Sequence, residues 1–251
     1  MATAMDAAMD MVMVTAMVIE NTDMEEESKF TDMGKMQRTN LKKMGVRRIS
    51  QKSNYIKFKS FMDKIASVAG LVFLSPVFLG IILAIKLEEG WGAPVFFKQK
   101  RIGIHKTHFM LYKFRSMRVD APKDVPTHLM RNPEDYLTKI GSWLRKTSMD
   151  ELPQLLNILQ GDMTFIGPRP ALWNQFDLIE ERDKYGANDV KPGLTGWAQV
   201  NGRDEISIEE KAGLDGYYVR NMGICLDIRC LLRTVIVVLT HEGVAEGGSR
   251  R

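Results

Sequence analysis

Residues 65–85 read IASVAGLVFLSPVFLGIILAI, and this stretch decides what kind of fold the chain adopts. Its 21 residues carry no charge and lie between Lys64 and Lys86. As one helix they would be about 32 Å long at about 1.5 Å per residue, close to the bilayer core of about 30 Å. A helix in the core of a soluble protein, the alternative, normally has a polar face. Only Ser67 and Ser75 are polar here, so the pattern predicts a membrane segment.

The dipeptide Ser75-Pro76 near the middle of this segment predicts a break. Proline removes a backbone donor and clashes with the preceding turn, and a serine can bond the carbonyl left free. A straight crossing and a bent, re-entrant dip both fit. The positive-inside rule keeps the basic residues 29–64 in the cytoplasm, so a straight crossing would export residues 86–251. A bend would return them, which the two reduced-looking cysteines weakly favour.

The chain has 251 residues, 45% of them hydrophobic, which is enough for one sizeable domain. Its net charge of +4 is distributed in blocks. Residues 1–28 contain seven acids and no Lys or Arg, whereas residues 29–64 contain eleven Lys or Arg and two acids. Such a basic block suits nucleic acid or an anionic membrane. The apolar segment that follows favours the membrane, and no nucleic-acid partner is expected. We interpret residues 1–50 as a disordered extension.

Beyond the membrane segment the pattern is that of an α+β, helix-rich domain with short strands. The segments APVFFKQKRIG and HFMLYKFRSM alternate apolar and polar residues and predict two strands around a turn at Gly103. KPGLTGWAQVNGR predicts a loop with one short strand. Helices are predicted at 134–146, at 150–160 with an end near Gly161, at 170–185 and at 205–221. Residues 226–240 predict either an interfacial amphipathic helix or a core helix with two solvated arginines.

Common catalytic signatures are absent from the sequence. It has no G-x-x-x-x-G-K-[ST], G-x-G-x-x-G, H-E-x-x-H, G-x-S-x-G or D-x-D. No motif therefore supports assignment to the P-loop NTPases, the Rossmann dinucleotide-binding enzymes, the zincins or the serine hydrolases.

Two adjacent carboxylates, Asp150 and Glu151, stand in the segment SMDELP. Ser148 and Glu151 fit a helix capping box, S-x-x-E. With Ser148 as N-cap, however, Pro153 would delete a helical hydrogen bond. With Asp150 near the N-cap, Pro153 falls in the first turn, where its missing donor costs little. We therefore expect Asp150 at a helix N-terminus, an end that suits phosphate. A plain cap and a catalytic pair both remain open on spacing alone.

Several cations are placed by rigid local structure around this pair. Prolines in GDMTFIGPRP, residues 161–170, fix a turn that presents a guanidinium suited to bidentate phosphate contact. On the strand LYKFRSMR, alternate residues project to one face. Solvated surface arginines are the alternative for each group. Together they suggest a phosphate-rich substrate; the cations are Lys113, Arg115, Arg118, Arg145, Lys146, Arg169 and Arg203.

The order of these motifs resembles a known family. It comprises SP within an apolar helix, YKFRSM, R-x-x-S-x-DELPQL-x-N-x-L-x-GDM, GPRP, KPGLTGWAQVNGR and LDGYYVRN. This order is similar to that of the bacterial sugar transferases, the monotopic phosphoglycosyl transferases that act on polyprenyl phosphate. The resemblance covers about residues 54–245 and leaves residues 1–50 outside. Without the multi-span N-terminal domain of larger members, the chain resembles the minimal catalytic form.

The resemblance implies a two-step, ping-pong transfer. Asp150 would attack the β-phosphate of a UDP-sugar, release UMP and hold the phospho-sugar. Undecaprenyl phosphate would then accept it. Glu151 would bind Mg²⁺, which offsets phosphate charge, and Arg145 would contact phosphate. Lys113 and Asp215 match further functional positions.

The resemblance also implies substrate contacts by Arg169 and Arg203 and a re-entrant helix broken at Ser75-Pro76. Residues 54–86 would then be interfacial and re-entrant, 87–245 a cytoplasmic catalytic domain at the bacterial inner membrane, and 246–251 a flexible tail. Inner-membrane lipids are expected partners, and a homodimer is left open. Three rivals remain: a glycosyltransferase that releases UDP, a membrane-anchored scaffold, and a single-span protein with an exported domain.

Overall fold

The computed structural model describes residues 52–122, 133–202 and 206–240. The helices are α3 (Ser53–Phe73), α4 (Ser75–Glu89), α5 (Lys139–Lys146), α6 (Gln154–Gln160), α7 (Phe176–Asp183), α8 (Trp197–Val200), α9 (Ile208–Asn221) and α10 (Ile224–Thr240). The strands are β1 (Phe96–Ile102), β2 (His108–Phe114), β3 (Thr164–Ile166) and β4 (Gly193–Thr195). This is the expected α+β, helix-rich class. The expectations for residues 1–50 and 246–251 lie outside the described residues.

The apolar segment is broken at the predicted dipeptide. Within the described ranges no single helix has the length and apolar character to cross a membrane. The pair α3 and α4 meets both criteria only when taken together, and it is bent by 59°. Pro76 has no N–H for the carbonyl of Val72, and the Ser75 hydroxyl donates to that carbonyl at 2.8 Å instead. The predicted break is confirmed, and of the two alternatives left open the helices adopt the bent one.

The polar face of α3 points into the protein. Tyr55, Lys59, Asp63 and Ser67 recur every four residues, so they share one helix face. Asp63 pairs with the Thr164 hydroxyl in β3, and Ser67 donates to a carbonyl in α6 at 2.9 Å.

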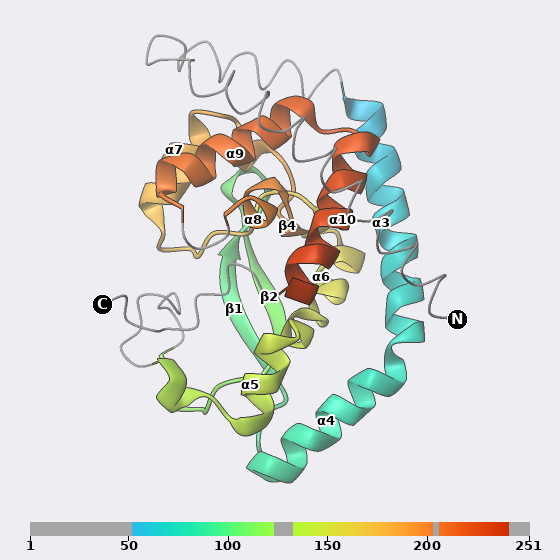
Figure 1. Cartoon of the computed structure of the whole chain (residues 1–251), viewed down its shortest axis with the longest axis vertical. Helices are drawn as coiled ribbons and strands as arrows, with labels where there is room; N and C mark the ends of the chain where they lie inside the picture. Colours follow the sequence, from blue (N-terminus) through green and yellow to red (C-terminus); the bar gives the residue numbers. More distant parts are fainter. Residues whose placement is uncertain (1–51, 123–132, 203–205, 241–251) are drawn as a thin grey trace. The chain divides into compact units, whose positions relative to one another are not determined.

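The first two residues of this face meet Asp227 of α10. Tyr55 donates to its Oδ2 at 2.6 Å, and Lys59 forms an ion pair with the same oxygen. Tyr218 of α9 donates to the other carboxylate oxygen at 2.8 Å. Figure 1 shows α3 beside α10, as these contacts require.

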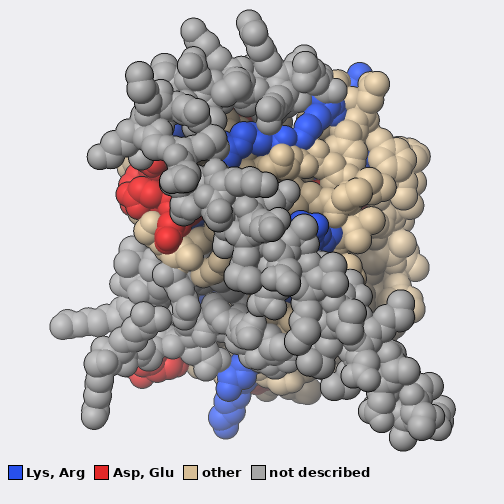
Figure 2. Space-filling view, turned by 45° about the horizontal axis from the view of Figure 1, so that its top comes forward, with Lys and Arg blue, Asp and Glu red and all other residues tan. Residues whose placement is uncertain are grey.

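The opposite faces of α3 and α4 are apolar and exposed. Figure 2 shows the α3 flank, at the right of the view, with almost no charged side chains. Phe73 is 83% exposed, and Leu79 on α4 is 67% exposed, so this surface is unlike that of an ordinary soluble helix. The residues concerned are Phe58, Phe61, Met62, Ile65, Val68, Val72, Phe73, Val77, Leu79, Leu83 and Leu87.

The far end of α4 is also fixed to the domain. Ile81 and Ile85 are buried in a cluster with Phe114 of β2 and Leu144 of α5. The carboxylate of Glu88 accepts the first backbone N–H groups of α5 at 2.8 and 2.9 Å, where a negative charge is favourable. Both arms of the bent pair therefore contact the same domain.

The predicted hairpin is confirmed. β1 and β2 pair antiparallel, with Phe96 opposite Phe114 and Ile102 opposite His108. The loop between them begins at Gly103, where a Cβ would meet the Thr107 hydroxyl at 3.1 Å. The short strand predicted in KPGLTGWAQVNGR is β4, which pairs in parallel with β3.

The predicted helices differ from the observed ones mainly at their starts. Residues 134–146 divide into a 3₁₀ turn, Pro133–Tyr136, and α5. The 170–185 helix begins only at Phe176. The end of α6 at Gly161 is confirmed, because this glycine takes the left-handed conformation with φ 95° that caps a helix.

Of the two interpretations of residues 226–240, the core helix describes the inner face of α10, although Arg233 is not solvated as expected but donates to Asn201 and lies over the Trp197 ring. The interfacial interpretation stays a prediction. Leu226 and Cys230 are buried in the core cluster with Trp197 and Tyr218. The outer face is apolar too, with Ile224, Ile228, Leu231, Leu232 and Val235 exposed.

We predict that Lys59→Met destabilises the protein strongly. Removing one partner of a buried ion pair leaves Asp227 uncompensated and costs about 3 kcal/mol, so we expect the thermal unfolding midpoint in detergent to fall by roughly 5–10 °C. The matched control is Lys57→Met, since Lys57 is exposed on the same helix. Equal midpoints for the two variants would contradict a structural role for this ion pair.

Candidate functional site

The segment SMDELP forms a 3₁₀ turn ahead of α6. Ser148 adopts the left-handed conformation at φ 55°, ψ 16°, and Met149–Glu151 form the turn. Ser148 makes no side-chain capping bond, and Pro153 is the N-cap of α6. The capping-box alternative at Ser148, which the position of Pro153 argued against, is therefore excluded. The expectation that Asp150 stands at the N-terminus of this helix is wrong, because Asp150 lies in the 3₁₀ turn and α6 begins only after Pro153. A left-handed serine is a local strain of the kind that clusters at functional sites.

A capping box does form elsewhere. Ser207 accepts the N–H of Glu210 at 3.2 Å, and Glu210 accepts the N–H of Ser207 at 3.1 Å. The pair therefore caps α9. The same S-x-x-E spacing at Ser148 makes no cap.

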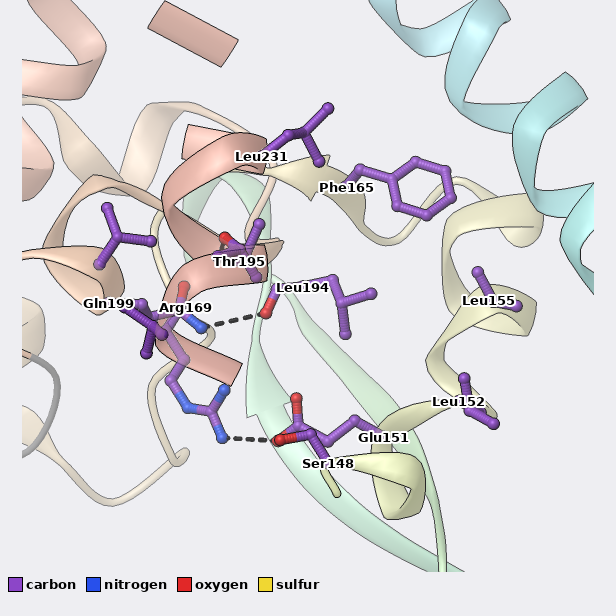
Figure 3. Close-up of a pocket in the computed structure, with 13 residues that line it drawn as sticks. Ser148, Glu151, Leu152, Leu155, Phe165, Arg169, Leu194, Thr195, Gln199 and Leu231 are labelled. Carbon is purple, nitrogen blue, oxygen red and sulfur yellow. Dashed lines mark hydrogen bonds and ion pairs between the residues drawn. The ribbon is translucent and has the colours of Figure 1, made fainter. Parts of the chain in front are cut away.

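The 3₁₀ turn buries both carboxylates against cations. Asp150 is 6% exposed. Lys113, from β2, lies 2.7 Å from Glu151 Oε1 and 3.5 Å from Asp150 Oδ2. Arg169 donates to the same oxygen of Glu151 at 2.8 Å (Figure 3). The two carboxylates are thus neutralised by a lysine and an arginine that come from different elements.

The two neighbouring carboxyl groups differ in the direction of their pKa shifts. Burial raises the pKa of Asp150, and the charge of Glu151 adds to this rise, although Lys113 opposes it. Burial would also raise the pKa of Glu151, but the charges of Arg169 and Lys113 and the hydrogen bonds they donate hold it well below its usual range. Glu151 is therefore a fixed anion, and Asp150 is the more basic of the two.

The turn that carries Arg169 is clamped from both sides. Arg182 of α7 donates to the Arg169 carbonyl at 2.8 Å and is paired with Asp215 of α9 at 2.6 Å. Arg101 of β1 donates to the Pro170 carbonyl at 3.0 Å and is itself held by Gln99. These contacts fix the backbone on either side of the Arg169 side chain, which limits the geometry in which it meets Glu151.

Gly167 allows this turn to lie against β4. Its N–H donates to the Thr195 carbonyl at 2.8 Å, and the Gly193 N–H donates to the Pro168 carbonyl at 2.8 Å. A Cβ at Gly167 would lie 2.6 Å from the Lys191 carbonyl oxygen, so a larger residue would push the turn away.

The other predicted cations divide into two groups. Arg145 of α5 faces the acidic pair: burial lowers its pKa, whereas Asp150 and Glu151 act to raise it. Its Nε donates to Ser116 at 3.0 Å. Arg115 instead donates to the Pro94 carbonyl at 2.8 Å, and Arg118 pairs with exposed Asp120.

Two predicted substrate-binding residues remain, Asp215 and Arg203. Asp215 is 1% exposed, and in this structure it meets Arg169 through Arg182. Arg203 lies outside the described residues. Two residues of the clamp, Arg101 and Arg182, were missed by the sequence analysis. Arg101 stood within the predicted strand QKRIG, but nothing in the sequence connects α7 with α9.

A pocket of about 230 Å³ opens beside Glu151 and Arg169. Figure 3 shows the two charged side chains paired at one end, with mainly apolar side chains and the polar Thr195 and Gln199 around the rest. Its walls come from α6, β3, β4, α8 and α10; the lining residues are Ser148, Glu151, Leu152, Leu155, Phe165, Arg169, Leu194, Thr195, Gln199, Val200, Leu231, Thr234 and Val237.

The residues at this site were also tested as metal ligands. Among the described residues, no three His, Cys, Asp or Glu side chains converge as a metal site would require. Mg²⁺, however, is often held by one or two carboxylates together with substrate phosphates and water. Asp150 and Glu151 fit that pattern, with Glu151 the permanently ionised member.

The chain was compared with known proteins. The family model described as bacterial sugar transferase matches residues 54–241. The chain is 44% identical over 188 residues to the uncharacterized sugar transferase EpsL of Bacillus subtilis, covering 75% of this chain and 90% of that protein.

Two relatives whose names state a reaction match this chain over only part of their own length. The UDP-glucose:undecaprenyl-phosphate glucose-1-phosphate transferase of Xanthomonas campestris is 36% identical, over 81% of this chain and 42% of its own length. The undecaprenyl-phosphate galactose phosphotransferase of Salmonella typhimurium is 34% identical, over 74% and 41%. The chain thus spans less than half of these two relatives. The extent of the family match and the identity to EpsL place it in one group: the chain belongs to the bacterial sugar transferase family.

Proposed function

We propose that this sugar transferase moves a sugar-1-phosphate from a UDP-sugar to undecaprenyl phosphate. The observation that carries the proposal is the buried pair Asp150 and Glu151, neutralised by Lys113 and Arg169 beside a mainly apolar pocket. A phosphate donor needs the cations, and a lipid acceptor needs the apolar surface. The names of two relatives, a UDP-glucose:undecaprenyl-phosphate glucose-1-phosphate transferase and an undecaprenyl-phosphate galactose phosphotransferase, support these substrates.

In the first proposed step Asp150 is the nucleophile. Its carboxylate oxygen attacks the β-phosphorus of the UDP-sugar, the bond from that phosphorus to the bridging oxygen breaks, and UMP leaves. The raised pKa makes Asp150 a better nucleophile than an ordinary carboxylate, and Lys113 favours its ionised form. The product is a phospho-sugar covalently bound to Asp150.

In the second proposed step the lipid phosphate attacks the same phosphorus. The bond to Asp150 breaks, the carboxylate is regenerated, and the lipid leaves as a diphosphate-sugar. Lys113, Arg145 and Arg169 balance the charge on the phosphoryl oxygens in both steps. Glu151 would hold Mg²⁺ through its carboxylate, and the ion would supply further positive charge to the phosphates.

The bent pair α3 and α4 supports a monotopic arrangement at the cytoplasmic face of the inner membrane. The inner face of α3 contacts α10, β3 and α6, and the far end of α4 contacts α5. A straight crossing would carry these two arms to opposite sides of the bilayer. A dip into one leaflet leaves both arms on the side where nucleotide sugars are made and lets a soluble donor meet a lipid acceptor.

We predict that Asp150→Asn lowers the rate of UMP release at least about a thousandfold, because the amide is a poor nucleophile. The assay uses detergent-solubilised protein, undecaprenyl phosphate, Mg²⁺ and a panel of UDP-sugars. Asp120→Asn, at an exposed carboxylate, should retain wild-type activity. UDP instead of UMP in the wild-type reaction would favour a glycosyltransferase, and unchanged turnover by Asp150→Asn would reject this nucleophile.

The clamp on the Arg169 turn should matter for rate more than for folding. We expect Arg101→Met to lower kcat/KM for the UDP-sugar by about 10- to 100-fold, because a shift of about 1 Å in a catalytic group has this effect. Arg101→Lys, which keeps one donor for the Pro170 carbonyl, should recover part of the loss. Lys98→Met, at an exposed position on the same strand, is the control. A rate loss that simply follows the unfolding midpoint across these variants would argue against positioning.

Removal of divalent cations with EDTA should stop UMP release, and added Mg²⁺ should restore it. The expectation follows from the diphosphate of the donor, whose charge exceeds what the local cations balance. Full activity in EDTA would mean that Lys113, Arg145 and Arg169 suffice without a metal.

A further inference from the structure

Away from Glu151, the polar side chains of the pocket bond mostly to other groups of the protein. Thr195 and Thr234 share a hydrogen bond of 2.7 Å, and Thr234 also reaches the Cys230 carbonyl. The amide nitrogen of Gln199 donates to the Leu194 carbonyl at 3.0 Å, while its oxygen is buried and accepts no hydrogen bond from the described residues. One acceptor is too little to recognise a nucleobase, which presents several donors and acceptors.

The apolar wall of the pocket is continuous with the bend of the membrane-associated pair. Leu155 lines the pocket and belongs to a buried cluster, against which half-buried side chains pack from two sides. They are Phe165 and Leu194 of the pocket wall, and Leu71 and Leu74 at the end of α3. The packing is close: a Cβ at Gly70 would lie 3.3 Å from Leu155 Cδ1. The inner wall of the pocket is therefore packed against the helix break.

The outer wall is provided by α10 and leads to exposed apolar surface. Leu231 lines the pocket and is 46% exposed, and its neighbour Leu232 is 47% exposed but does not line it. Ile228 and Val235 on the same helix are exposed as well. An apolar chain that leaves the pocket along α10 would therefore meet further apolar surface rather than a polar rim.

The size of the pocket suits a short branched hydrocarbon. Pockets that enclose a drug-sized ligand have volumes of about 300–1,000 Å³. A volume of about 230 Å³ therefore suits a short apolar segment, and not a whole polyprenyl chain.

We propose that this pocket holds the first isoprene units of the lipid acceptor, with the lipid phosphate directed toward Arg169 and the acidic pair. The proposal rests on the proposed function for the identity of the acceptor. The pocket then fixes the phosphate end of a long, mobile lipid close to Asp150, while the rest of the chain stays in the membrane. Recognition of the acceptor is thereby separate from recognition of the nucleotide.

Filling the pocket should impair the second step and leave the first intact. We expect Leu231→Trp to raise the KM for undecaprenyl phosphate at least tenfold. The burst of UMP that the enzyme releases without acceptor should keep its wild-type amplitude and rate. Leu232→Trp, the matched control with the same exposure on the same helix, should leave both readouts unchanged.

Two results would overturn the proposal. A smaller or slower UMP burst for Leu231→Trp, with an unchanged KM for the lipid, would assign the pocket to the donor. Identical kinetics for Leu231→Trp and Leu232→Trp would leave the pocket without a role in acceptor binding. If the wild-type protein releases no UMP at all, the proposed function fails. A binding experiment then decides whether the pocket holds an isoprenoid chain.

That experiment uses a geranyl phosphate that carries a diazirine on its second isoprene unit. On irradiation of the full-length protein we expect labelling of residues 152–155 or 231–237, suppressed by undecaprenyl phosphate and reduced in Leu231→Trp. Labelling confined to the exposed apolar face of α3 and α4 would contradict the proposal, because the first isoprene units of the lipid would then lie on that face and not in the pocket.

Discussion

The burial of two adjacent carboxylates is the constraint on which the site depends. Asp150 and Glu151 follow one another in a 3₁₀ turn and are almost withdrawn from water, an arrangement that is stable only with excellent cationic partners. Lys113 comes from the hairpin, Arg169 from the rigid Gly-Pro turn, and Arg145 from α5. The fold brings these three elements to one place, and the clamp by Arg101 and Arg182 holds the turn that carries Arg169.

The second organising feature is a helix with its polar face turned inward. The inner face of α3 bonds to α10, β3 and α6, and the last of these follows the acidic pair directly. Its outer face, like that of α4, is apolar and exposed. The break at Leu74 lies between the two arms, and its side chain packs in the same cluster as the apolar wall of the pocket. The exposed apolar surface, the helix break and the candidate site are therefore parts of one packed unit.

The sequence revealed those features that local chemistry determines. Ser75-Pro76 predicts the break because the missing donor of the proline and the serine hydroxyl act within one turn. Gly103 and Gly161 predict a hairpin turn and a helix end for equally local reasons. The acidic pair and its cations could be selected as candidates from local sequence, but their spacing left a plain helix cap open, and only the resemblance to the sugar transferases implied a role for them.

What the sequence could not reveal depends on distant contacts. The motif S-x-x-E occurs twice in the sequence. At Ser207 it forms a capping box on α9, whereas at Ser148 the serine adopts a strained left-handed conformation, and the spacing alone does not distinguish the two. The pairing of Arg182 with Asp215 joins residues far apart in the chain and gives Asp215 a buried place that no motif indicates. The pocket requires side chains from five elements and has no sequence signature at all.

The central claim of this account is a covalent phospho-sugar on Asp150. Its most direct test is mass spectrometry of the protein after incubation with the preferred UDP-sugar and Mg²⁺ in the absence of lipid acceptor. The account predicts that the intact protein gains the mass of one sugar phosphate, that the gain maps to the peptide containing Asp150, and that undecaprenyl phosphate removes it. A protein that turns over the donor without any such adduct, or that carries it on another residue, would contradict the account.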